Sequence, residues 1–175
     1  MALIFVDCEA YGGCPATGKL IEFCAIELKS CKTFYRKLVP SKQDTANAAI
    51  QIPLDSIALE NEISIFQEFD IWLSQFDGRP IFVSDNVAYD WQWINDGFHR
   101  TLGYNPFGHS GRRIGDFYAG LVGDFYAKQK WKDLRVTKHD HNPVNDCNGN
   151  IDAFTYILSV IDAQRSAKIY IPLDL

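Results

Sequence analysis

The first third of the chain is a series of short apolar runs separated by turn residues. The runs cover Leu3–Val6, Leu20–Leu28 and the region around Thr33–Val39, with a glycine-rich loop at 12–18 between the first two. Runs of this length bounded by Gly and Pro are typical of buried strands joined by tight turns. The rest of the chain alternates one more such run with segments of helical spacing. This order predicts an α/β layer fold with a mixed sheet.

Two helices are predicted on either side of that further strand, Pro80–Val83. The first carries an apolar stripe made by Ile65, Phe69, Trp72, Leu73 and Phe76. The second covers Asn86–Asn95, and Gly97 is expected to end it because glycine is a poor helix former. Residues 42–61 have a weaker pattern and are expected to be loop with some helix.

Two more helices are predicted in the last third of the chain. After a loop over Gly103–Gly111, the first has a stripe of Ile114, Phe117, Leu121 and Phe125. The second begins near Asn142-Pro143, because Asn caps helices and Pro suits the first helical position. Its stripe is Phe154, Ile157, Leu158 and Ile161. Residues 168–175 are expected to form a short extended tail.

The length and composition favour one domain over residues 1–175. The 175 residues are 47% hydrophobic, which is enough for a buried core. No apolar run approaches the roughly 18 residues that span a bilayer, and no basic residue precedes Leu3–Val6 as in a signal peptide. The five cysteines build neither a disulfide framework nor a CxxC metal site. We therefore expect no membrane association and a reducing, cytoplasmic location.

Two carboxylates stand two positions apart where the first strand ends. Alternate residues of a strand point to the same side, about 6.5 Å apart along the backbone, so Asp7 and Glu9 can converge while Cys8 faces the opposite layer. Carboxylates this close repel unless a cation lies between them, and oxygen ligands suit Mg²⁺ or Mn²⁺ better than zinc. The alternative is a polar pair that opens a loop.

A third carboxylate follows the strand Pro80–Val83. Asp90 is expected near the start of the next helix, where a negative charge is favoured electrostatically. That position alone accounts for an Asp there, and Asp85 or Asn86 can serve as the helix cap. The function of this segment therefore stays open on its own residues.

The last acidic position lies in the first turn of the final helix. Asp146 follows His141 by five residues, so a histidine in the preceding loop can lie over whatever Asp146 binds. Histidine acts as a general base near neutral pH. A surface loop histidine and a helix-start aspartate are the alternative, since each is common singly.

Together these segments resemble the DEDDh 3′–5′ exonucleases of the ribonuclease H-like superfamily. Asp7-x-Glu9, Asn86-x-x-Tyr89-Asp90 and His141-x-x-x-x-Asp146 occur in the order and rough spacing of that family's motifs. Leu20–Ile26 looks like the family's second strand, and Arg113–Asp116 resembles the segment after the second motif. The compact length is similar to that of small stand-alone bacterial exoribonucleases. The resemblance implies a central mixed β-sheet flanked by α-helices.

The resemblance also implies a reaction. It makes His141 the general base of a two-metal hydrolysis at the 3′ end of RNA or short single-stranded oligonucleotides. The competing histidine, His139, lies two residues too far from Asp146 for the motif. The ligands of two Mg²⁺ or Mn²⁺ ions would be Asp7, Glu9, Asp90 and Asp146.

Substrate binding is assigned by the same resemblance to Ala10, Tyr11 and Asn86. Ala10 stands where family members often have Thr or another polar residue, a departure that bears on the terminal-nucleotide pocket. Pro143 replaces the usual Ala and is tolerated at a helix start. Family members are often dimers, which implies a homodimer or higher homo-oligomer, to which the apolar tail Ile169–Leu175 could contribute.

The basic residues are concentrated in one segment. The chain has 17 basic and 22 acidic side chains, a net charge of −5 that argues against a broad duplex-binding surface. Residues Ser110–His141 nevertheless hold seven basic and four acidic side chains, so the segment is about +3. Within it, Lys128, Lys130 and Lys132 are predicted to grip phosphates and Trp131 to stack on a base. The alternative is a solvated helix face with a half-buried Trp.

Two other functions fit the same residues. One is a phosphodiesterase for a small or cyclic oligonucleotide signal, which would use the same acidic site. The other is a non-catalytic nucleic-acid-binding subunit on the same scaffold. The complete set of four acids and a histidine argues against the second, because a binding protein has no need for all five groups.

Overall fold

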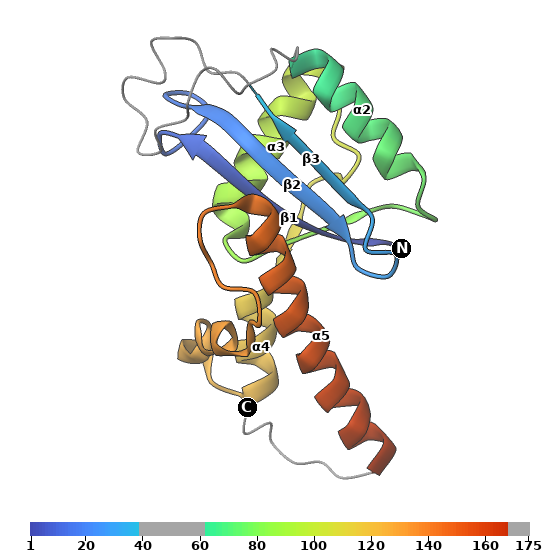
Figure 1. The fold of residues 1–175 in the computed structure, drawn as a ribbon, viewed down its shortest axis with the longest axis vertical. Coiled ribbons are helices and arrows are strands. Elements are labelled where there is room, and N and C mark those ends of the chain that lie inside the picture. The colour runs from blue at the N-terminus through green and yellow to red at the C-terminus, as the bar shows by residue number, and fades with distance from the viewer. Residues whose placement is uncertain (39–61, 168–175) are drawn as a thin grey trace.

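A five-stranded mixed sheet forms the centre of the molecule (Figure 1). The computed structural model describes residues 1–38 and 62–167. Its sheet has the strand order β3-β2-β1-β4-β5. The central strand β1 pairs antiparallel with β2 and parallel with β4, so the predicted α/β fold with a mixed sheet is confirmed. The strands are β1 (Leu3–Tyr11), β2 (Lys19–Glu27), β3 (Thr33–Lys37), β4 (Ile81–Ser84) and β5 (Gly111–Arg113).

Helices cover both faces of this sheet. In Figure 1, α2 and α3 lie on one face and α5 crosses the other, with α4 beside the middle of α5. Among the described residues, no helix combines the length and apolar character that a membrane span requires. The expectations for residues 42–61 and 168–175 lie outside the described ranges. The helices are α2 (Glu62–Ser74), α3 (Val87–Leu102), α4 (Ile114–Val122) and α5 (Pro143–Ala167), with 3₁₀ turns η2 (Phe125–Ala127) and η3 (Lys130–Leu134).

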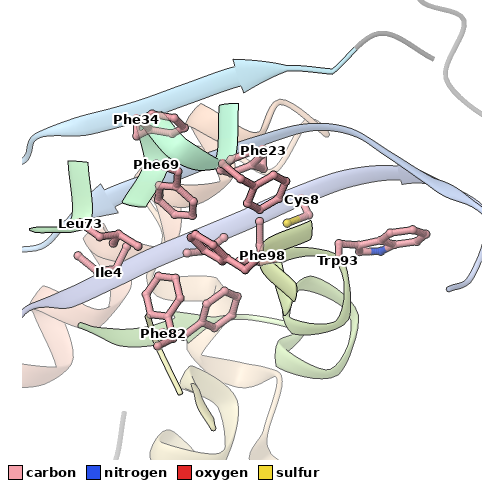
Figure 2. Packing of buried hydrophobic residues seen from close by; sticks show 14 of the residues in the cluster. Ile4, Cys8, Phe23, Phe34, Phe69, Leu73, Phe82, Trp93 and Phe98 are labelled. Carbon is pink, nitrogen blue, oxygen red and sulfur yellow. The ribbon is translucent and has the colours of Figure 1, made fainter. Parts of the chain in front are cut away.

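An aromatic core fills the space between the sheet and α2 and α3. Figure 2 shows its rings gathered around β1 and β2, together with Ile4 and Cys8 of β1. Phe69 lies at its centre and stacks on Phe34 at 4.9 Å and on Phe98 at 5.4 Å between ring centroids. Each buried Phe of this kind stabilises the fold by about 1.5–3 kcal/mol.

The alternation of β1 divides its side chains between two cores. Ile4 and Cys8 belong to the aromatic core, whereas Phe5 packs on the other face against Val83 and residues of α4 and α5. Asp7 and Glu9 follow Phe5 at intervals of two and therefore lie on the α5 side of the sheet. The strand pattern thus presents both carboxylates to α5.

Several element boundaries differ from the sequence prediction. Helix α4 ends at Val122, before Phe125 of its predicted stripe, because Gly123 caps it in a left-handed conformation. Strand β1 continues beyond Val6 to Tyr11, and a short strand, β5, ends the predicted loop. Helix α3 passes through Gly97 and ends at Leu102, and its cap, Gly103, adopts a left-handed conformation with φ of 80°. Gly97 is a contact point instead of a stop, because a β-carbon there would lie 1.9 Å from the ring of Phe66.

The final helix starts where the sequence predicts. The side-chain oxygen of Asn142 accepts hydrogen bonds from the backbone N–H groups of Val144 at 3.0 Å and Asn145 at 3.4 Å. These bonds satisfy donors that have no partner inside the helix. The cap fixes the first turn of α5 and with it the position of Asp146.

Candidate active site

Three carboxylates from two distant parts of the chain meet at the middle of the sheet. Asp7 and Glu9 come from β1, and Asp146 comes from the first turn of α5. One oxygen of each lies within 4.8 Å of an oxygen of the others. The polar-loop alternative for Asp7 and Glu9 does not hold, because both residues lie within a strand and face the same carboxylate of α5.

Asp90 joins this cluster from the other layer of the fold. It is buried in the first turn of α3, where its Oδ1 accepts a 3.1 Å hydrogen bond from the backbone N–H of Cys8. Its Oδ2 accepts a hydrogen bond from the Ser84 hydroxyl at the end of β4. These two bonds orient the carboxylate between β1 and β4, next to Asp7.

The burial and mutual repulsion of the four carboxylates make it unfavourable for all of them to be ionised at once. Burial, followed by the charges of Asp90 and Asp146, raises the pKa of Asp7 well above its usual value. Burial also raises the pKa of Glu9 to about 7, and His141 opposes that shift. The pKa of Asp90 is raised to about 7, again mainly by burial. Such a site favours either protons or a cation.

The donor set fits a hard divalent cation. All four groups offer carboxylate oxygens, which are the ligands that Mg²⁺ and Mn²⁺ prefer. Asp146 is 99% buried and Asp90 97% buried, so water cannot relieve their charges as it would at the surface. A divalent cation would neutralise the repulsion among these carboxylates.

Two histidines lie over the cluster. The His141 Nδ1 is 3.7 Å from the Oε1 of Glu9, and its side chain is 69% exposed. The His139 Nδ1 is 2.7 Å from the Oδ2 of Asp146. Their rings are 4.5 Å apart between centroids. Sequence spacing assigned His141 to Asp146, whereas the structure pairs His141 with Glu9 and His139 with Asp146.

The loop that carries both histidines is tied to α5. The carboxylate of Asp152 accepts hydrogen bonds from the backbone N–H and the hydroxyl of Thr137, at 3.0 and 2.9 Å. The backbone N–H of Asp140 donates to Asp146 at 3.2 Å. Gly149 lets the loop approach the helix, since a β-carbon there would lie 2.5 Å from the carbonyl oxygen of Thr137.

Asp85 adds a further charge that the sequence did not assign to the site. Its carboxylate lies 2.6 Å from the Lys132 Nζ and 3.4 Å from the Arg135 Nη2. Its negative charge also raises the pKa of Asp7 and of Asp90. Asp85 is therefore not a helix cap. In the sequence, its role is indicated only by its position directly before Asn86, where the second motif begins.

The predicted substrate-binding residues divide into two groups. Ala10 and Tyr11 end β1 beyond a bulge at Glu9/Ala10, and Asn86 is exposed at the N-terminus of α3. The Tyr89 hydroxyl donates to the carbonyl oxygen of Ala10 at 3.3 Å, which brings the ends of the first two motifs together. The side chain of Asn86 makes no capping bond and is available to a ligand.

The second group lies on η2 and η3 and includes one correction. Lys128 and Lys130 are exposed, while Lys132 is paired with Asp85. Trp131 is fully buried, and its Nε1 donates to the carbonyl oxygen of Lys128 at 3.1 Å. The stacking role predicted for Trp131 is therefore wrong, because neither face of its ring can receive a base.

Comparisons with known proteins show which folds and sequences this chain resembles. No family model matches the sequence. The nuclease domain of 3′hExo, a DEDDh family member bound to rAMP, superposes with a TM-score of 0.66 at 15% identity over 91% of this chain and 92% of that one. The chain has the fold of the DEDDh exonucleases. Product-bound exonuclease I superposes with a TM-score of 0.62 at 16% identity over 90% of this chain and 43% of that one.

Sequence comparison points the same way. The Escherichia coli 3′–5′ DNA exonuclease Cap18 is 25% identical over 168 residues, which cover 88% of this chain and 90% of that protein. The DEDDh resemblance and the ribonuclease H-like fold expected from the motifs are thereby confirmed. The sequence comparison supports a 3′–5′ exonuclease, and the structural comparison supports the fold. Exonuclease I is more than twice as long, so the superposition covers less than half of it.

Proposed function

We propose that this chain is a metal-dependent 3′–5′ exonuclease acting on single-stranded nucleic acid. The observation that carries the proposal is the meeting of Asp7, Glu9 and Asp146 within 4.8 Å, with Asp90 oriented beside them. Four buried or half-buried acids in one place destabilise a fold, and the cluster is explained by a cation that the reaction needs.

The four carboxylates would hold two Mg²⁺ or Mn²⁺ ions. Bound there, the ions would lower the pKa of a water, hold the scissile phosphate and stabilise the leaving 3′ oxygen. The contribution of the chain is to fix the ligands. Asp7 and Glu9 are fixed by the strand, Asp146 by the Asn142 cap, and Asp90 by its bonds to Cys8 and Ser84.

His141 is the proposed general base. Its ring is exposed above Glu9, so it can reach a water at the cluster and release the proton to solvent. His139 is held against Asp146 and would orient that carboxylate. The two histidines thus have different proposed roles although both lie over the site.

The proposed substrate is a single strand with a free 3′ end. The net charge of −5 disfavours tight binding to duplexes, and the segment Ser110–His141 holds seven of the 17 basic residues. The sequence alone left the choice between RNA and DNA open. The relationship to a protein named as a DNA exonuclease shifts the proposal toward DNA, with RNA as the comparison substrate.

Location, domain count and assembly stay predictions. The cysteines of the described residues are all free, which fits a reducing cytoplasm. One domain over residues 1–175 and a homodimer or higher homo-oligomer are retained as proposals. Size-exclusion chromatography with light scattering would measure the oligomeric state directly.

The test is an end-labelled degradation assay. Single-stranded DNA and RNA carrying a 5′ label are incubated with Mg²⁺, with Mn²⁺ or with EDTA, and a 3′-labelled strand gives the direction. We expect stepwise shortening from the 3′ end only with metal, and loss of at least about a thousandfold in Asp7→Asn. Asp77→Asn, an equal change at an exposed loop residue, serves as the matched control.

Three results would contradict the proposal. Activity that persists in EDTA or in Asp7→Asn excludes the carboxylate mechanism. Cleavage of a cyclic oligonucleotide in preference to linear strands would favour the signal phosphodiesterase. Strand binding with no cleavage under any metal would favour the non-catalytic binding subunit.

A further inference from the structure

Two aromatic side chains of η2 are almost fully exposed. Phe125 and Tyr126 in η2 are 83% and 89% exposed, and their rings are 5.9 Å apart at right angles. They lie in the basic segment Ser110–His141, close to the exposed lysines Lys128 and Lys130. Adjacent large rings in water are unfavourable unless a ligand covers them.

The backbone that presents these rings is fixed. The Asp124 carboxylate accepts a 2.9 Å hydrogen bond from the backbone N–H of Tyr126, and the Asp124 N–H donates to Ala119 in α4 at 3.1 Å. On the other side, the buried Trp131 donates to the carbonyl oxygen of Lys128. Gly115 of α4 lies so close to that carbonyl that a β-carbon would be 2.3 Å away.

A groove of about 360 Å³ runs beside Phe125 between α4 and η2. Its rim carries two cations, Arg113 and Lys128, and one carboxylate, Asp116, which is 3.3 Å from the Nη1 of Arg113. Within residues 1–38 and 62–167, neither Lys128 nor Lys130 has a carboxylate within 4 Å. The groove therefore offers an aromatic wall and unneutralised positive charge. Its lining is Arg113, Asp116, Ala119, Gly120, Gly123, Phe125 and Lys128.

The groove is joined to the carboxylate cluster through Arg113. The Nε of Arg113 donates to the backbone carbonyl of Asp85 at 3.0 Å, and the Asp85 carboxylate holds Lys132. Asp85 in turn lies within electrostatic range of Asp7 and Asp90. A polyanion that leaves the cluster along this side passes cations first and the exposed rings next.

We propose that Phe125 and Tyr126 form a stacking platform for the single strand upstream of its 3′ end, with Lys128 and Lys130 contacting its phosphates. Bases of any sequence stack on aromatic rings, and flanking cations bind the backbone without reading sequence. The two exposed lysines that follow the rings favour this polyanion over an apolar protein partner. The platform rests on the proposed exonuclease function, because it extends the path of that substrate.

The test compares strands that reach the platform with strands that do not. The double variant Phe125→Ala/Tyr126→Ala is measured against wild type on a 15-nucleotide and a 3-nucleotide oligothymidylate. We expect the ratio of kcat/KM for the long strand to that for the short strand to fall about tenfold. Phe125→Trp/Tyr126→Trp keeps the rings and should restore the ratio. Tyr156→Ala, a half-exposed aromatic on α5, is the matched control.

Binding separates the failure of the platform from the failure of the enzyme. Fluorescence anisotropy with a labelled 15-mer in EDTA needs no cleavage, and we expect about tenfold weaker binding in the double alanine variant. Weaker binding without any cleavage by wild type would retain the platform and overturn the exonuclease. Unchanged binding and an unchanged ratio would overturn the platform. A change of oligomeric state in the variant, with strand binding intact, would assign the rings to a protein interface instead.

Discussion

Two histidines only two residues apart contact different acids of one cluster. A general base needs a nitrogen that is free to take a proton, and the 3.7 Å separation of His141 from Glu9 is longer than a hydrogen bond. His139 is engaged with Asp146 at 2.7 Å. We therefore expect His141→Ala to lower kcat by about 10²–10⁴-fold and His139→Ala by less than about tenfold. Single-turnover rates at saturating Mg²⁺ measure both.

The outcome that would reverse these roles is a larger loss in His139→Ala. The pH profile gives an independent readout. Loss of the base should remove the acidic limb of the kcat profile, whereas loss of an orienting group should leave that limb and lower the plateau.

The raised pKa of Glu9 predicts an unusual pH dependence of stability. Because the pKa is about 7 in the native state and 4.5 in the unfolded chain, the native protein holds an extra proton between these values. The free energy of unfolding of the metal-free protein should therefore fall as pH rises through this window. We expect Tm to drop by at least about 3 °C from pH 5 to pH 7.5 in EDTA, and by less in Glu9→Gln.

Metal should reverse this trend, because it binds the deprotonated carboxylates. The rise in Tm on adding Mn²⁺ should be larger at pH 7.5 than at pH 5.5. A metal-free Tm that increases with pH, measured by differential scanning fluorimetry, would contradict the arrangement of charges.

At the scale of elements, the contact between α2 and α3 depends on one missing side chain. A β-carbon at Gly97 would lie 1.9 Å from the Phe66 ring, so Gly97→Ala must push the helices apart. We expect a loss of about 1–3 kcal/mol in the free energy of unfolding. Gly120→Ala is the same change in α4, where nothing lies within 4 Å, and should stabilise by about 0.5–1 kcal/mol. Denaturant titration measures both, and equal effects would refute the packing argument.

This contact explains why the boundary of α3 could not be predicted. Helix propensity predicts that a helix ends at Gly97. The sequence does not reveal that Phe66 packs against this position, where only glycine leaves room. The same limit applies to Trp131, whose burial depends on α4 and α5 packing around it. Elements set by local spacing, such as β2 and the start of α5, were predicted closely because neighbouring residues decide them.

The loop above the cluster makes a comparable contact with α5. A β-carbon at Gly149 would lie 2.5 Å from the carbonyl oxygen of Thr137, two residues before His139. Gly149→Ala should therefore displace the histidine loop and lower kcat by about tenfold or more, because small misplacements of a catalytic group are costly. Asp77→Asn, the exposed loop variant used in the degradation assay, is again the control for kcat. Full kcat together with a lower Tm would show that the contact supports stability alone.

For the whole molecule, the meeting of distant motifs was predictable in part. The alternation of side chains along β1 predicted that Asp7 and Glu9 lie on the same side. The order of the motifs predicted that Asp90 and Asp146 join them. Sequence spacing does not reveal the pairing of His139 with Asp146 or the approach of Asp85, since both depend on how loops fold back. The exposure of Phe125 and Tyr126 in η2 was not predicted either, because Phe125 fitted the apolar stripe of a helix.

The distribution of charge gives a prediction for the molecule as a whole. Its net charge is −5, but Ser110–His141 carries about +3. The salt dependence of strand binding should therefore come from a few contacts between this segment and phosphates. Each phosphate contact with a single strand contributes about 0.7 to the slope of log binding constant against log salt. Replacing Lys128 and Lys130 with Gln should therefore reduce the slope by about 1.4. Anisotropy with a labelled 15-mer from 50 to 300 mM KCl measures it.

The control must change the net charge equally at another place. Lys29→Gln/Lys32→Gln does so in the exposed turn between β2 and β3, far along the sheet from the proposed strand path (Figure 1). If binding follows a local track, this control should change the slope by less than about 0.3, since its charges release no counterions from the strand. Equal changes in both double variants would mean that the overall field of the protein, not the segment beside the cluster, governs attraction of the strand.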